Sequence, residues 1–131
     1  MDIDYGSIIE RGDSPFINIL RKMNDEGGFK ASFIVDAQGF PVATVTNQYD
    51  TEIASVMVSQ VRNAVEQLLT RINMADAEEV TTRGKDRTRL ISRFFTLGDE
   101  GLILVVVAPP GCSYRRLTNQ AIRAIEATWS T

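Results

Sequence analysis

The chain contains no histidine and a single cysteine, Cys112, among its 131 residues. Without histidine it lacks the commonest general base and the commonest metal ligand, and no Ser-His or Cys-His catalytic pair can form. One cysteine excludes an internal disulfide framework and is typical of a reducing compartment, so we expect a cytoplasmic protein. These absences exclude a large share of enzyme mechanisms.

Long apolar runs and an excess of basic charge are also missing. The longest apolar run, 102–108, is the size of a strand and far shorter than the roughly 18 residues of a membrane span. The acidic N-terminus lacks the layout of a signal peptide. A net charge of −3 argues against a dedicated nucleic-acid-binding protein. With 44% hydrophobic and 24% charged residues, the composition is that of a globular protein.

Capping residues and apolar periodicity predict three helices and five strands. The first helix should begin at Pro15, after an N-cap at Asp13 or Ser14, and end at Gly27. A long second helix is predicted from Thr51 to Asn73, after an N-cap at Asp50, and a last one from Tyr114 to about Trp129. Strands are predicted near 30–36, 40–46, 77–84, 87–97 and 101–108.

The stretch FIVDAQGFPVATVT, residues 33–46, predicts a β-hairpin with a short loop. Gly39 is free to adopt a positive φ, and Asp36 can accept hydrogen bonds from its own chain just downstream. Pro41 has no N–H to donate, so it should begin a strand or lie at a sheet edge.

The order α-β-β-α-β-β-β-α predicts an α+β domain with one five-stranded, mostly antiparallel sheet covered by helices. The segment 101–108 is apolar on both faces and should therefore be central in the sheet. Residues 1–12 are expected to form an N-terminal segment and residues 13–131 a single domain.

The second helix carries more apolar surface than one sheet can cover. Its apolar residues span an arc of about 160°, against roughly 100° for a single buried face. An exposed surplus indicates an interface, most simply a two-fold dimer, although deep burial within the domain is the alternative. The sequence does not decide which part of the arc meets the sheet. The arc consists of Ile53, Ala54, Met57, Val58, Val61, Ala64, Val65, Leu68, Leu69 and Ile72.

Two glycine-containing stretches are candidates for anion sites. RGKDR fails as a phosphate-binding loop, because Asp86 follows the lysine and Glu79 occupies the place of the first glycine. PPGCSYRR places Arg115 and Arg116 at a helix start beside Cys112, an arrangement that would suit an anion. A phosphatase loop, however, requires arginine where this chain has threonine, so a structural strand-to-helix turn is favoured.

The acidic residues form no recognisable site either. Glu78 and Glu79 are neighbours on a strand and face opposite sides, and no EF-hand spacing exists. We therefore predict no catalytic residue, no cofactor and no metal site, and a protein that is not an enzyme. The strip 83–93 has five basic residues against one acid, which fits a solvated hairpin or a contact for an acidic partner.

Two stretches, taken in this order, resemble the roadblock / dynein light-chain family. FIVDAQGFPVATV resembles that family's first hairpin, and TRGKDRTRLISRFFTLGDEGLILVVVAPPGCSYRRL is similar to its passage from the third strand to the last helix. The resemblance covers residues 14–129. It implies a sheet with the long middle helix on one face and the two outer helices on the other, as in related profilin-like and longin domains.

The resemblance also implies partners. Family members form homodimers, or heterodimers with a related roadblock protein, in which third strands pair edge to edge and middle helices pack together. They are non-catalytic platforms that bind Ras-like small GTPases and modulate their cycle, as in bacterial cell polarity, or adaptors without a GTPase. The interface would use Met57, Val61, Ala64, Leu68, Ile72 and Val80, with Arg83, Lys85 and Arg87 as candidate partner contacts.

Overall fold

The computed structural model describes residues 15–46, 51–73 and 77–130, with the backbone alone for 51–57 and 130. The predicted N-terminal segment 1–12 and the predicted N-caps Asp13, Ser14 and Asp50 therefore lie outside the described residues. The described elements confirm the predicted order of three helices and five strands. They are α2 (Pro15–Gly27), β1 (Ala31–Asp36), β2 (Pro41–Val45), α3 (Thr51–Arg71), β3 (Glu79–Arg83), β4 (Arg89–Leu97), β5 (Glu100–Ala108) and α4 (Arg115–Ser130).

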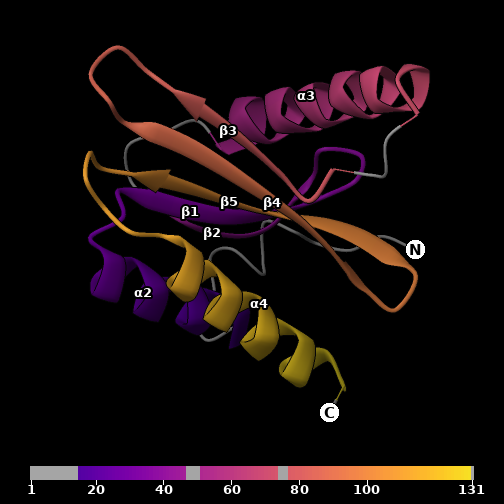
Figure 1. Ribbon diagram of the computed structural model, residues 1–131. Helices are drawn as coiled ribbons and strands as arrows, with labels where there is room; N and C mark the ends of the chain where they lie inside the picture. The colour runs from indigo at the N-terminus through magenta and orange to yellow at the C-terminus, as the bar shows by residue number, and fades with distance from the viewer. Residues whose placement is uncertain (1–14, 47–50, 74–76, 131) are drawn as a thin grey trace.

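The five strands form one antiparallel sheet in the order β2-β1-β5-β4-β3. The apolar strand β5 is central, as predicted, with Val105 opposite Phe33 of β1 and Ile103 opposite Phe94 of β4. Figure 1 shows α3 on one face of the sheet and α2 and α4 on the other, which is the predicted layering. The strands β2 and β3 are left as the two edges.

The β1–β2 turn is held by the residues that the sequence singled out. The Asp36 carboxylate accepts hydrogen bonds from the N–H groups of Gln38 (2.9 Å) and Phe40 (3.0 Å). Gly39 has a φ of 96°, a conformation that side chains disfavour. Pro41 is the first residue of the edge strand β2, where its missing N–H breaks no ladder.

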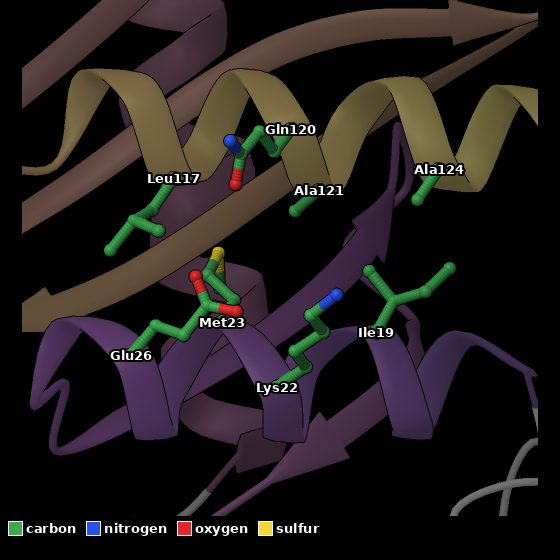
Figure 2. A pocket seen from close by; sticks show the side chains of 8 residues that line it. All are labelled: Ile19, Lys22, Met23, Glu26, Leu117, Gln120, Ala121 and Ala124. Atoms are coloured by element: carbon green, nitrogen blue, oxygen red, sulfur yellow. The ribbon is translucent and has the colours of Figure 1, made fainter.

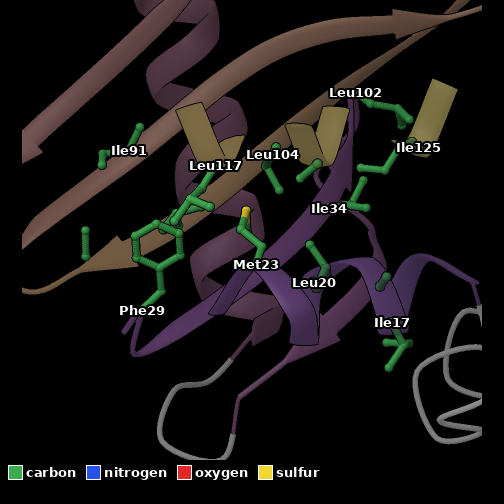
Figure 3. Close-up of a cluster of buried hydrophobic side chains, with 14 of the residues drawn as sticks. Ile17, Leu20, Met23, Phe29, Ile34, Ile91, Leu102, Leu104, Leu117 and Ile125 are labelled. Carbon is green, nitrogen blue, oxygen red and sulfur yellow. The ribbon is translucent and has the colours of Figure 1, made fainter. Parts of the chain in front are cut away.

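The larger core lies between the sheet and the helices α2 and α4. Ile17, Leu20 and Met23 of α2 point into it, and Leu117 and Ile125 of α4 complete it from the other helix (Figure 3). These apolar side chains recur at helical spacing, so each helix buries a single stripe. The apolar stripe of each outer helix is therefore covered by the sheet and by the other helix.

A smaller core lies between the sheet and α3. Its buried members are Phe33 and Val35 of β1, Ile103 and Val105 of β5, and Val58 of α3. Among the α3 side chains that the structure describes, Val58 is the one buried apolar residue. Part of the described apolar arc of α3 is therefore left outside this core.

Candidate dimer and partner interface

α3 presents a row of apolar side chains to solvent. Val61, Leu68 and Ile72 are 45%, 58% and 54% exposed, and Ala64 is exposed between them. Their spacing of three and four residues places them along one line of the helix surface. We call Val61, Ala64, Leu68 and Ile72 the α3 row. Contiguous apolar surface of this kind on a folded domain indicates an interface.

The other described residues of the apolar arc face the protein's own sheet. Val58 is buried, and Val65 and Leu69 are half-buried. The structure therefore divides the arc in a way that the sequence left open, with one side toward the sheet and the other toward solvent. The Met57 side chain lies outside the described part of α3, so its predicted place in the interface stays a prediction.

A polar groove of about 540 Å³ separates α3 from β4. The Arg62 guanidinium lies over the Phe94 ring, 5.4 Å from its centroid, and Glu66 and Ala77 line the same groove. Because Ala77 lies two residues before β3, the groove extends from α3 toward the start of the edge strand. Val80 of β3 is half-buried.

The β3–β4 turn carries the predicted basic contacts. Arg83, Lys85 and Arg87 are all exposed, at the end of β3 and in the turn itself. The Asp86 carboxylate accepts hydrogen bonds from the Thr88 N–H (3.0 Å) and hydroxyl (3.2 Å), which hold the turn. These bonds lower the pKa of Asp86 and keep it ionised. The three cations lie within five residues of the chain, and their role as partner contacts stays a prediction.

Glu79 connects the edge strand to α4. Its Oε2 accepts hydrogen bonds from the Tyr114 hydroxyl (2.7 Å) and the Thr81 hydroxyl (2.8 Å). Its Oε1 lies 3.6 Å from Arg93 Nε and 4.0 Å from Arg115 Nη1. Burial raises the pKa of Glu79, but the two hydrogen bonds and the charges of the two arginines outweigh it, so the net shift is downward.

We expect Glu79→Gln to lower stability at neutral pH by on the order of 1 kcal/mol, because the charged hydrogen bonds are lost. The folded pKa lies below the unfolded value, so the carboxylate stabilises the fold above about pH 4.5. That contribution disappears as the pH falls through the folded pKa, and the two proteins should converge in stability below it. Urea denaturation at several pH values and one protein concentration measures this difference in stability.

The control is Glu78→Gln, at an exposed neighbour, which should match the wild type. A pH-independent difference between Glu79→Gln and the wild type would show that the ionised carboxylate of Glu79 is not what stabilises the fold.

The segment around Cys112 is a structural turn. The Cys112 thiol donates to the Gly27 carbonyl (2.9 Å), and the Arg89 guanidinium donates to the carbonyls of Cys112 and Pro109. Arg89 also lies over the Tyr114 ring, 5.4 Å from its centroid. These contacts use the thiol and the nearest arginine for packing, as the favoured interpretation of PPGCSYRR requires. Among the described residues, no cluster of three His, Cys, Asp or Glu side chains could hold a metal.

A second, smaller groove lies on the opposite face of the molecule, between α2 and α4 (Figure 2). Its volume is about 100 Å³, and Lys22 and Glu26 of α2 and Gln120 of α4 form its polar rim. Apolar residues of the larger core form its floor, so the groove is a shallow dip between two packed helices. In the described part of the chain, no helix is long and apolar enough to cross a membrane.

Comparison with known protein families decides the assignment. The model of the Roadblock/LC7 domain family matches residues 17–108, which is most of the chain and includes α3 and all five strands. This chain belongs to the Roadblock/LC7 domain family. The family that the two sequence stretches resembled is thereby confirmed.

Three solved structures share the fold of this Roadblock/LC7 domain. Myxococcus xanthus MglB has a TM-score of 0.78 at 15% identity, covering 90% of this chain and 97% of that one. The gliding protein MglB of Thermus thermophilus has a TM-score of 0.72 at 18% identity, covering 95% and 96%. An MglB structure described as a tetrameric arrangement has a TM-score of 0.73 at 18% identity, with the same coverage. Comparison with curated proteins finds no match.

Two features of this Roadblock/LC7 domain were missed from the sequence. The contact of Arg62 with Phe94 and that of Glu79 with Tyr114 each join residues distant in the chain. Neither pair lies in a motif, and an arginine on a helix or a glutamate on a strand is ordinarily solvated. For these residues, the sequence indicated only that β3 lies at the sheet edge, and it did so through the family resemblance.

Proposed function

We propose that this protein is a dimeric, non-catalytic regulator or scaffold that binds a Ras-like small GTPase and modulates its cycle. The observation that carries the proposal is the α3 row, which a lone domain would leave in water. The Roadblock/LC7 family assignment supports it, as does the structural similarity to MglB proteins, one of which is described as tetrameric.

In the proposed dimer, the α3 rows of two copies pack against each other across a two-fold axis. Val61, Ala64, Leu68 and Ile72 meet their counterparts, with Met57 extending the row and Val80 beside it on β3. Burying a large aliphatic side chain stabilises association by about 1.5–3 kcal/mol. Three such side chains on each protomer, each about half exposed in one copy, would each contribute roughly half of that amount to the pairing.

The GTPase would meet the basic turn, where Arg83, Lys85 and Arg87 are exposed. The positive charge of this turn would suit an acidic surface on the partner. It would also raise the rate at which the two proteins associate. With no histidine in the chain, we assign the protein no catalytic group of its own. It would act by binding one nucleotide state of the GTPase more tightly than the other, which shifts the population toward that state.

The test uses Ras-like small GTPases from the same organism, each loaded with GDP or with a non-hydrolysable GTP analogue. We expect one nucleotide state to bind at least about tenfold more tightly, a free-energy difference of about 1.4 kcal/mol, and the rate of hydrolysis or of nucleotide release to change. The double variant Lys85→Glu/Arg87→Glu should weaken binding, whereas Lys22→Glu on α2 should not. Biolayer interferometry measures the affinities.

Binding that ignores the nucleotide, or no binding to any of these GTPases, would contradict the regulator. The first outcome would favour a structural adaptor, the alternative that the family also contains. A dimer that binds none of the GTPases would favour the adaptor as well, because the interface does not depend on them.

A further inference from the structure

We propose that the segment preceding α2, residues 1–14, folds back over the end of α4 and covers Trp129 with its isoleucine pair, Ile8 and Ile9. The covered surface lies on the α2–α4 face of the sheet, opposite α3, so the inference depends on neither the proposed dimer nor its GTPase (Figure 1). The occupant is this chain's own segment, chosen because of where α2 begins, how far the segment reaches and which charges it carries.

Trp129 continues the buried stripe of α4 past the end of the core. It follows Ile125 by four residues, on the same side of the helix, yet Ile125 is 0% exposed and Trp129 is 56% exposed. Gly98 of the β4–β5 turn lies against the indole, since a Cβ atom added there would come within 3.7 Å of Trp129 Nε1. Tryptophan is highly buried on average in folded proteins. The turn therefore covers one part of the ring, and the rest is a place for an apolar group.

The segment joins the domain at the end where this ring is exposed. Figure 2 shows α2 and α4 running antiparallel, with Ile19 of α2 and Ala124 of α4 at the same end of the groove between them. Pro15, the first residue of α2, comes one turn before Ile19, and Trp129 comes just over one turn after Ala124. The chain therefore enters α2 beside the end of α4 that carries Trp129.

The segment is long enough to cross from one helix to the other. An extended chain spans about 3.3–3.6 Å per residue, so the six residues from Pro15 back to Ile9 reach about 20 Å. The axes of two packed helices are only about 8–10 Å apart. Ile8 and Ile9, the one pair of adjacent apolar residues in the segment, can therefore reach the indole of Trp129 with chain to spare.

Charge selects the side from which the segment approaches the indole. The segment contains four acidic residues and one basic residue. Over 15–22 of α2 and 122–130 of α4, the exposed charged residues are three cations and one acid: Arg21, Lys22, Arg123 and Glu126. The β4–β5 turn, against the other part of the ring, instead exposes two adjacent acids, Asp99 and Glu100. An acidic segment is attracted by the helices and repelled by the turn, so it should reach the ring along α2.

The cover has a consequence for assembly. Exposed apolar surface at the end of α4 would favour contacts between copies on the α2–α4 face as well as on α3. With Trp129 covered by its own chain, association through the α3 row is favoured over association through this second face.

Fluorescence tests the proposal directly, because Trp129 is the only tryptophan of the chain. In the 131-residue protein, Ile8→Ser/Ile9→Ser should shift the tryptophan emission to longer wavelength and raise its acrylamide quenching constant toward that of a small tryptophan derivative. The matched variant Ile8→Leu/Ile9→Leu keeps two apolar side chains and should retain the wild-type emission and quenching. Circular dichroism and light scattering should give the same fold and mass for all three proteins.

Wild-type emission and quenching in a folded Ile8→Ser/Ile9→Ser protein would overturn the proposal. Emission that changes with protein concentration would overturn it as well and identify a second copy as the occupant, because a segment of the same chain covers Trp129 at any concentration. The path along α2 has its own test: Lys22→Glu/Arg123→Glu should raise the quenching constant at low salt and raise it much less at about 1 M salt. No rise at low salt would overturn that path.

Discussion

We expect that replacing Leu68 with aspartate will convert the proposed dimer to monomers or make the protein insoluble. Leu68 lies in the middle of the α3 row and is 58% exposed in one copy. Each protomer of the dimer would lose the burial of a leucine, about 1.5–3 kcal/mol, and would also desolvate a carboxylate opposite apolar groups. The dissociation constant should rise by at least about a thousandfold, which corresponds to roughly 4 kcal/mol. Light scattering coupled to gel filtration measures the mass.

The same change at Trp129 is the matched control. Trp129 is 56% exposed, like Leu68, but it lies on α4, on the opposite face of the sheet. Trp129→Asp should keep the dimer mass, and Val61→Asp should repeat the effect of Leu68→Asp. A folded Leu68→Asp protein with the wild-type mass, judged by light scattering and circular dichroism, would show that the α3 row is not the dimer interface.

Local patterns in the sequence were sufficient to predict the helices and strands and several of their structural details. The turn at Asp36 and Gly39, the edge position of Pro41 and the central place of β5 all follow from the chemistry of single residues or short runs. Helix spacing likewise showed that α3 has a wide apolar arc. In each case the physical cause lies within a few residues of its effect, so no tertiary contact had to be known.

The division of that arc required the coordinates. Val58 is buried and Val61 is 45% exposed, although they are one turn apart and chemically alike, because helix rotation relative to the sheet decides their burial. The pairing of β3 with β4 depends in the same way on a strand register that only the coordinates give. The sequence left the order of the strands open, and only the family resemblance implied the layering of the helices.

Phe33→Ala should have the largest effect on folding. Phe33 is 1% exposed and belongs to the small core that joins α3 to the sheet. Deleting a buried phenylalanine side chain costs about 3–5 kcal/mol, from lost burial and from the cavity left behind. Phe40→Ala is the control in the same hairpin, since Phe40 is 57% exposed and should cost less than about 1 kcal/mol. Urea denaturation at fixed protein concentration gives both free energies of unfolding.

The part of the structure that Phe33→Ala destabilises is as informative as the size of the stability loss. Because Val58 is the one described α3 side chain buried in that core, Phe33→Ala should lower amide-exchange protection in α3 more than in α2 or α4, whose core is separate. A loosened α3 also presents its apolar row less regularly, so the variant should dimerise more weakly than the wild type although Phe33 itself lies outside the interface. Unchanged α3 protection, or a loss spread evenly over the three helices, would show that the sheet contact at Val58 does not control the position of α3.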